Sequence, residues 1–202
     1  MTVSFARRWS VLPSDGRRRG RAWTALRRSA AVVELLAIAL WLGGMLALGA
    51  IAAPVVFARV ALPSSADAMT VVFQRFDVLA IASAAAVLVA EGAIFVSSAI
   101  SSMTSSAVGS AVSSARFTAR DLWRVGAAAL AGGIAVVEAT AVAPRIAALH
   151  AAGVLRGIGS GGMELGRLHD IAEGCGKAEV VLLVAVVVLQ VVALSEGPRH
   201  LS

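Results

Sequence analysis

Two carboxylates that stand inside long apolar stretches are the residues of this sequence best placed to do chemistry. Glu91 lies 13 residues beyond Val78, where its stretch begins, and Glu138 lies 13 residues beyond Val125. An ionisable side chain is costly in lipid, so such a residue within a membrane segment is a functional candidate by default. Gln190, in the last apolar stretch, is the predicted partner of Glu91.

Two interpretations of Glu91 remain open. As a functional group it would bind a proton or a cation, and as a structural group it would be a protonated carboxyl bonded to Gln190 or Ser83. The structural interpretation is favoured more strongly for Glu138, because Arg145 lies seven residues on, on the same face of a helix. In antiparallel helices Glu91 and Glu138 sit at different depths, so we do not expect one paired acid site.

Charged residues also gather before the last apolar stretch and at the ends of others. The densest group is Glu164, Arg167, His169, Asp170, Glu173, Lys177 and Glu179. His169 and Glu173, one helical turn apart, could supply two metal ligands, but a closed site needs more, and ordinary salt bridges explain the group as well. The sequence therefore predicts no metal site. Glu34 and Arg124 are predicted to lie at the membrane interface.

In a transport protein, charged side chains at the outer ends of the helices would form a polar vestibule. Arg75, Arg145, Arg167 and His169 are predicted to form it at the outer side, with Glu91 deeper inside. In this form the transport hypothesis requires Arg75, Arg167 and His169 to converge.

Four apolar stretches must position all of these residues. They run at about 35–57, 78–100, 125–142 and 180–194. The first has 23 residues without a charge, about 35 Å as a helix, which is enough to cross a hydrocarbon core of about 30 Å. Continuous Ala/Val/Leu runs exclude a β-barrel. Only 15% of residues are charged, against about 25% in soluble domains. We therefore predict an all-α polytopic membrane protein with four transmembrane helices in a bundle.

The bundle is predicted to consist of two similar helical hairpins. Pro54 precedes Arg75 by 21 residues and Pro144 precedes Arg167 by 23, within similar local motifs, so both hairpins would insert in the same direction. The two prolines are predicted to break the outer ends of helices one and three. Small residues spaced four apart on those helices are predicted to hold the bundle together. They are Ala39, Gly43, Ala47, Ala128 and Gly132.

Positive charge is concentrated at the start of the chain. Eight of the 18 Lys and Arg residues precede Ala30, and the net charge is +6. Beside a span this is a topology signal rather than a nucleic-acid footprint, and it predicts cytoplasmic termini in a bacterial inner membrane. We expect a basic tail at 1–28, a membrane domain at 29–196 and a short cytoplasmic end at 197–202. The partners expected are the bilayer, anionic lipid headgroups bound by the arginines, and a second copy of the chain.

Motifs for catalysis are missing from the sequence. It contains no H-E-x-x-H, no G-x-S-x-G and no phosphate-cradling glycine motif. The three histidines lie outside the predicted spans, which argues against a bis-histidine haem site. The single cysteine, Cys175, forms no intrachain disulfide. We therefore expect no enzyme, no catalytic residue and no cofactor.

Short motifs along the chain resemble a known family. W-L-G-G-M at 41–45 and A-P-V-V-F at 53–57 are similar to the opening helix of the bacterial relatives of transmembrane protein 205, the domain of unknown function 4149 family. V-A-P-R-I at 142–146 resembles the end of its third helix, and G-R-L-H at 166–169 the step into its fourth. The resemblance covers about 30–196.

This resemblance implies a four-span fold but no settled activity. Leu165 departs from the pattern, where a phenylalanine is expected, and Glu91 and Glu138 match no position of it. The opening Trp-x-Gly-Gly is also similar to copper-resistance membrane proteins of the D type. The leading hypothesis is transport or tolerance of a cation or small solute. The alternative is a non-transporting membrane scaffold or partner-binding protein whose basic tail recognises lipid.

Overall fold

The computed structural model describes residues 14–106 and 118–195, and both segments are almost entirely helical. Four long rods form the bundle, and two of them contain a π-helical turn. In chain order the elements are α1 (Ser14–Leu46), η1 (Ala47–Ala52), α2 (Ala53–Arg59), α3 (Ser64–Ser106), α4 (Ala119–Val137), η2 (Glu138–Val142), α5 (Ala143–Ala151) and α6 (Gly159–Ser195). The predicted all-α fold is confirmed for the described part of the chain.

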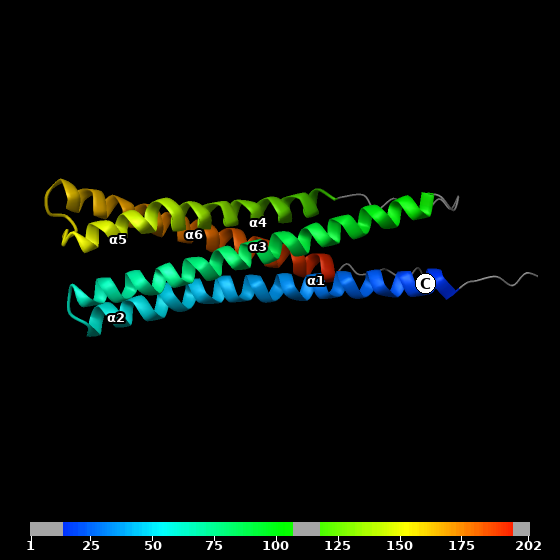
Figure 1. Ribbon diagram of the computed structural model, residues 1–202, viewed down its shortest axis with the longest axis horizontal. Coiled ribbons are helices and arrows are strands. Elements are labelled where there is room, and N and C mark those ends of the chain that lie inside the picture. The colour runs from blue at the N-terminus through cyan, green and yellow to red at the C-terminus, as the bar shows by residue number, and fades with distance from the viewer. Residues whose placement is uncertain (1–13, 107–117, 196–202) are drawn as a thin grey trace, which may run out of the picture.

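The rods are arranged as two hairpins that point the same way. α1, η1 and α2 lie against α3, while α4, η2 and α5 lie against α6, and α3 and α4 join the hairpins (Figure 1). Both tight connections, 60–63 and 152–158, lie at one end of the bundle, called here the hairpin end. The opposite end, where α1 begins and α6 finishes, is called the terminal end.

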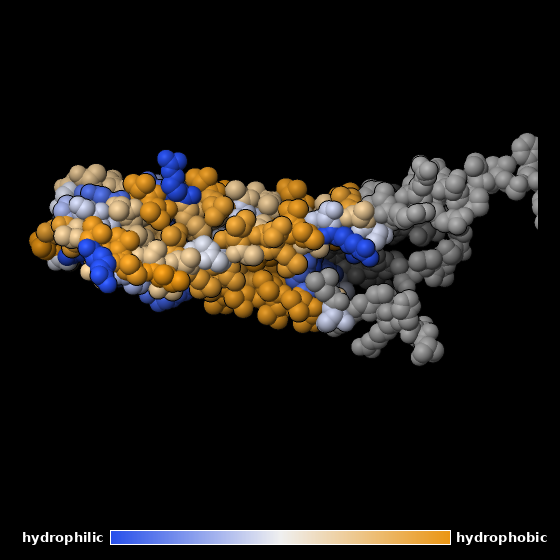
Figure 2. All heavy atoms as spheres, turned by 90° about the horizontal axis from the view of Figure 1, so that it is seen from below, coloured by the Kyte–Doolittle hydropathy of each residue, from blue (hydrophilic) through white to orange (hydrophobic). Residues whose placement is uncertain are grey.

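All four rods are long and apolar enough to span a membrane. The segments that meet this requirement are Thr24–Arg59, Ser64–Ser97, Ala119–Ala151 and Gly159–Ala193. Val89 is 72% exposed and Val181 68% exposed, as expected of side chains that face lipid. A broad apolar band covers the middle of the bundle, with polar side chains toward its ends (Figure 2). The chain is a multi-pass membrane protein.

The spanning helices extend beyond the apolar stretches of the sequence. α1 begins at Ser14, so residues 14–28 of the predicted tail continue the first span as helix. α3 runs to Ser106 and so continues the second span beyond the apolar stretch. Residues 1–13 of the predicted tail and the predicted end at 197–202 lie outside the described residues.

Small residues let the two hairpins approach closely through α3 and α4. A Cβ placed on Gly132 would lie 3.2 Å from the Cβ of Ala84, and Ala128 and Ala131 are buried in the same core. Close backbone approach of this kind stabilises helix packing in lipid, where no hydrophobic effect acts between helices. The predicted packing role of Ala128 and Gly132 agrees with this arrangement.

The prediction for the small residues of α1 was wrong. Ala39, Gly43 and Ala47 are exposed, and a Cβ on Gly43 would meet nothing within 4 Å. The opposite face of α1 enters the core instead, with Ile38 and Trp41 each about 1% exposed. Bulky side chains on that face make the larger contact with α3 and α6, so the small residues are left to the outside.

Pro54 and Pro144 do not end their helices, contrary to the prediction. Each proline is the second residue of a helix, α2 or α5, that continues the rod toward the hairpin end. The residue before each proline donates its N–H five residues back, Ala53 to Leu48 and Ala143 to Glu138. A proline ring clashes with the carbonyl four residues earlier in an α-helix, and the wider π turn relieves that clash.

Candidate functional site

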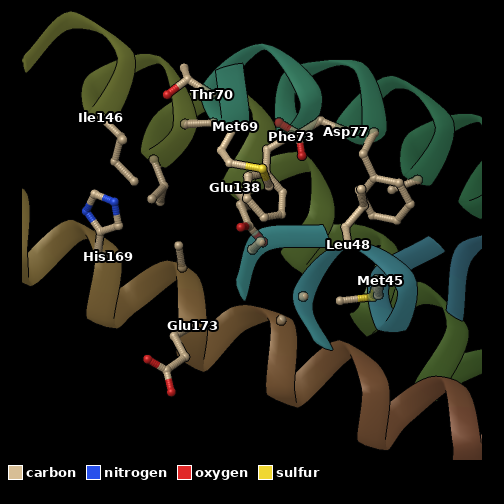
Figure 3. A pocket seen from close by; sticks show the side chains of 18 of the residues that line it. Met45, Leu48, Met69, Thr70, Phe73, Asp77, Glu138, Ile146, His169 and Glu173 are labelled. Atoms are coloured by element: carbon tan, nitrogen blue, oxygen red, sulfur yellow. The ribbon is translucent and has the colours of Figure 1, made fainter. Parts of the chain in front are cut away.

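A cavity of about 820 Å³ lies between the two hairpins, toward the hairpin end. All four rods contribute to its wall, from Met45 and Phe57 on the first rod to Val180 on the last. Most of the lining is apolar, including Phe73 and Met69 of α3, which Figure 3 shows beside the cavity. It has the size and character of a small-molecule site, since such pockets are typically about 300–1,000 Å³ and mostly apolar.

Besides Glu173, which is paired with Lys177, three carboxylates from three different elements line this cavity. They are Asp77 of α3, Glu138 of η2 and Glu179 of α6. They lie close enough for their charges to repel one another. Asp77 and Glu138 project toward the same space (Figure 3). We call this group the acidic cluster.

Glu179 is the most deeply buried member of the acidic cluster, at 2% exposure. Its Oε2 accepts a hydrogen bond of 3.1 Å from the indole Nε1 of Trp41, and its Oε1 has no partner. Within the described residues, none of the three carboxylates forms an ion pair. A buried oxygen without a partner is costly, so a hydrogen-bond donor or a cation beside Glu179 would stabilise it.

Two histidines stand nearer the hairpin end of the same cavity. The ring centroids of His150 and His169 are 5.7 Å apart, and Thr70 Oγ1 lies 3.3 Å from Nδ1 of His150. Nδ1 of His169 lies 2.9 Å from the carbonyl oxygen of Leu165. Because a carbonyl only accepts, this nitrogen carries the proton, and the other ring nitrogen is left to accept. The imidazole of His169 points into the cavity (Figure 3).

Two basic side chains also reach the cavity wall, but exposed carboxylates hold both of them. Arg156 Nη2 lies 2.8 Å from Asp170 Oδ1, and Lys177 Nζ lies 2.6 Å from Glu173 Oε1. These pairs leave the charge of the acidic cluster uncompensated. His169 and Glu173 do not form a metal site, because the carboxylate of Glu173, although this residue lines the cavity, is paired with Lys177 and turned away from His169 (Figure 3). In the described part of the chain, no three His, Cys, Asp or Glu side chains are placed to hold a metal ion.

The predicted arginine vestibule is not formed. Arg75 and Arg167 are exposed and do not line the cavity, and only His169 of the four predicted residues does. The reason is helical phase: Arg75 stands two residues before Asp77, and Arg167 two before His169, which turns each about 200° away from the cavity. The convergence required by the transport hypothesis in its first form is therefore missing.

Arg145 also takes a different partner from the predicted one. Its Nε lies 2.7 Å from Oε1 of Glu164 at the surface, and Glu138 is left in the cavity. A residue seven positions further along the chain returns to the same face only in a regular α-helix. The π turn at Glu138–Val142 adds an extra residue and rotates Arg145 away from Glu138.

A second polar group, the buried network, links all four rods closer to the terminal end. Arg124 of α4 binds Glu91 of α3 through Nη2 at 2.6 Å, and its Nε lies 2.5 Å from the other Glu91 oxygen as an ion-pair contact. Arg124 Nη1 also donates to Oε1 of Gln190 in α6. Gln190 Nε2 donates to Oε2 of Glu34 in α1 at 3.1 Å, and Oε1 of Glu34 lies 4.0 Å from Arg124 Nε.

The buried network corrects the sequence prediction in two ways. Glu34 and Arg124 are not interfacial, because both are buried and Glu34 is fully excluded from solvent. Gln190 is joined to Glu91 through Arg124 rather than directly. Each helix puts one polar residue at the same level, so charges that looked terminal in the sequence meet across helices, two carboxylates with one guanidinium. In the structure Glu91 is the ion-pair partner of Arg124.

An apolar layer separates the acidic cluster from the buried network. Fourteen residues separate Asp77 from Glu91, and fourteen separate Arg124 from Glu138, about 20 Å along each helix. Trp41, Val87 and Val186 are among the fully buried residues of this layer. The cavity is therefore closed toward the terminal end.

Residues of the W-L-G-G-M motif at 41–45 support the cavity. Trp41 holds Glu179, and a Cβ on Gly44 would lie 2.3 Å from the ring of Phe76, next to Asp77. Sequence reasoning missed Glu179, which it grouped with exposed charges, and it passed over Asp77. The available signal was the duplicated motif, in which Asp77 stands two residues after Arg75 as His169 does after Arg167.

The fold and the site define a multi-pass α-helical membrane protein with polar residues enclosed between its helices. The chain belongs to the family described as Domain of unknown function (DUF4149), whose model matches residues 36–154. That range holds Asp77, Glu138 and the Trp41 motif, while α6 with Glu179 lies beyond it. No curated protein and no solved structure matches the chain. The likeness to transmembrane protein 205 and to D-type copper-resistance proteins is not confirmed.

Proposed function

We propose that the protein binds a cation in the cavity of the acidic cluster, as part of the transport of that cation or of tolerance to it. The observation that carries the proposal is the set of three lining carboxylates without a paired cation, one of which, Glu179, is buried with an oxygen unpartnered. A cavity with apolar walls focuses the field of its charges and concentrates ions of opposite sign. A bound cation would also relieve the repulsion among the carboxylates.

The cavity opens toward the outer face of a bacterial inner membrane in this proposal. Support comes from the eight Lys and Arg residues before Ala30, six of which lie in α1 at the terminal end, since positive flanks favour the cytoplasmic side. The same arginines would bind anionic lipid headgroups. A passage to the terminal end would require the hairpins to separate at the apolar layer and the ion pairs of the buried network to exchange partners.

The test is complementation of a deletion strain on a panel of toxic inorganic and organic cations. Wild type is compared with Asp77→Asn, Glu138→Gln and Glu179→Gln, and with Glu164→Gln as the matched control, because Glu164 is at the surface and outside the cavity. Membrane levels are checked by immunoblot. We expect wild type and Glu164→Gln to restore growth on at least one cation and the three cavity variants to fail.

Full rescue by all three cavity variants would overturn the proposal. If deletion of residues 1–28 then abolished the restoration of growth while the cavity variants still restored it, the non-transporting scaffold would be the better account.

A further inference from the structure

We infer that the cation that fits this cavity is an amphipathic organic cation, with its charge at the acidic cluster and its apolar body against the aromatic and thioether side chains of the wall. This inference rests on the proposed function and names the substrate class of the same site. It depends on the size of the cavity, on the nature of its wall, and on where the charges lie within it.

The size of the cavity favours a molecule over a bare ion. About 820 Å³ lies in the range of pockets that enclose drug-sized ligands, about 300–1,000 Å³. A bare divalent cation instead needs several donors within about 2.0–2.6 Å. Within residues 14–106 and 118–195, no three His, Cys, Asp or Glu side chains are so placed.

The wall provides contacts for an apolar body. Phe57, Phe73, Met45 and Met69 line the cavity from the two rods of the first hairpin. The aromatic rings attract a cation through their faces, and methionine side chains adapt to ligands of irregular shape. Phe73 and Met69 lie beside Asp77 in Figure 3, so one ligand can touch rings and carboxylate together.

The charges lie at the inner part of the cavity, away from the hairpin end. Along α6, His169 comes ten residues before Glu179, so the carboxylate lies about 15 Å deeper. The unpartnered Oε1 of Glu179 is therefore at the inner part, where the cavity meets the apolar layer. A ligand held there would have its charge inward and its apolar groups toward the histidines.

The experiment measures binding to the full chain in nanodiscs of zwitterionic lipid, with empty nanodiscs subtracted. The probe is tetraphenylphosphonium, and the matched control is tetraphenylborate, which has nearly the same shape and the opposite charge. We expect saturable binding of the phosphonium alone. Asp77→Asn, Glu138→Gln and Glu179→Gln should each raise its Kd about tenfold or more, and Glu164→Gln should leave it unchanged.

A substitution in the cavity wall separates the contribution of the apolar contacts to binding from that of the carboxylates. Phe73→Ala should weaken phosphonium binding by a larger factor than it weakens the binding of a small cation such as tetramethylammonium, because the small cation loses only its contact with the ring face. Size exclusion and thermal unfolding of each variant show whether it remains folded. If one carboxylate variant fails this check, the other two carboxylate variants test the inference.

The outcomes distinguish the two proposals. Carboxylate-dependent binding of zinc or potassium ions without binding of tetraphenylphosphonium would overturn the organic-cation inference and support the proposed function. Equal binding of phosphonium and borate, or phosphonium binding unchanged in a folded triple carboxylate variant, would overturn the organic-cation inference. Absence of carboxylate-dependent binding for the organic and the inorganic cations alike would overturn both proposals. Mass spectrometry that finds a bound lipid at one per chain, not displaced by the phosphonium, would assign the cavity to lipid and overturn the inference.

Discussion

At the scale of single residues, the contact between Trp41 and Glu179 joins the W-L-G-G-M motif of the first rod to the candidate site. The indole nitrogen is the only described donor to this buried carboxylate, and it comes from a helix 138 residues away in sequence. A tryptophan is well suited to this position because its ring fills the apolar layer while its N–H reaches a polar group.

Replacement of Trp41 by phenylalanine tests this contact. Trp41→Phe removes the donor and leaves both oxygens of Glu179 unpartnered, so we expect a loss of about 1–3 kcal/mol in the free energy of unfolding. Trp123→Phe is the control, since Trp123 is 74% exposed, and we expect a change within about 0.5 kcal/mol. Denaturant unfolding in detergent measures both. Equal effects of the two substitutions would contradict the structural role assigned to Trp41.

Two adjacent glycines provide a second test at this scale. Gly44→Ala would place a Cβ 2.3 Å from the ring of Phe76, whereas Gly43→Ala meets nothing within 4 Å. We expect Gly44→Ala to cost about 1–3 kcal/mol through overpacking. Gly43→Ala should be neutral or stabilising by up to about 1 kcal/mol, because alanine favours helix more than glycine does. Thermal unfolding of the pair checks this, and destabilisation by Gly43→Ala alone would reverse the assignment of the two faces.

At the scale of helices, packing is decided by which face of each rod enters the core. The sequence predicted the four helices well, because an uncharged run long enough to cross the bilayer must form a helix whatever its neighbours are. It did not predict the faces. Gly43 and Gly132 stand in the same kind of spaced pattern, yet one is exposed and the other lies against Ala84.

Enlargement of these two glycines separates the faces. Gly132→Leu would force α3 and α4 apart, and we expect it to cost about 3 kcal/mol or to prevent a folded product. Gly43→Leu faces outward and should be tolerated within about 1 kcal/mol. Yield of monodisperse protein and its unfolding temperature are the measurements. Normal yield and stability of Gly132→Leu would show that α3 and α4 are not closely packed there.

At the scale of the whole molecule, one arginine joins the four rods at the level of the buried network. Glu34 and Arg124 could not be assigned to the core from sequence, because each stands at the edge of its apolar stretch, where charges usually meet water. Their polar partners come from other helices, and no local sequence pattern reveals them. The same holds for Glu179, which follows a run of exposed charges.

Removal of the Arg124 side chain should therefore destabilise the fold strongly. Arg124→Met leaves Glu91 and Glu34 buried without their cation, and we expect a loss of about 3–5 kcal/mol, while the double variant Arg124→Met/Glu91→Leu should recover much of it. Arg145→Met is the control, because its pair with Glu164 is exposed and such pairs contribute about 0–1 kcal/mol. Unfolding in detergent measures all three. No recovery in the double variant would show that Arg124 acts through contacts other than Glu91.

The π turns before Pro54 and Pro144 have a consequence for the comparison of homologous sequences. Each turn holds one more residue than the α-helix that it interrupts, so the hairpin-end part of the rod is rotated relative to the rest. A relative with a single-residue deletion between Trp41 and Pro54, or between Arg124 and Pro144, would have a continuous α-helix there and would turn other side chains into its cavity. Gaps of one residue at these two places therefore mark changes of the cavity lining, although the alignment on either side stays intact.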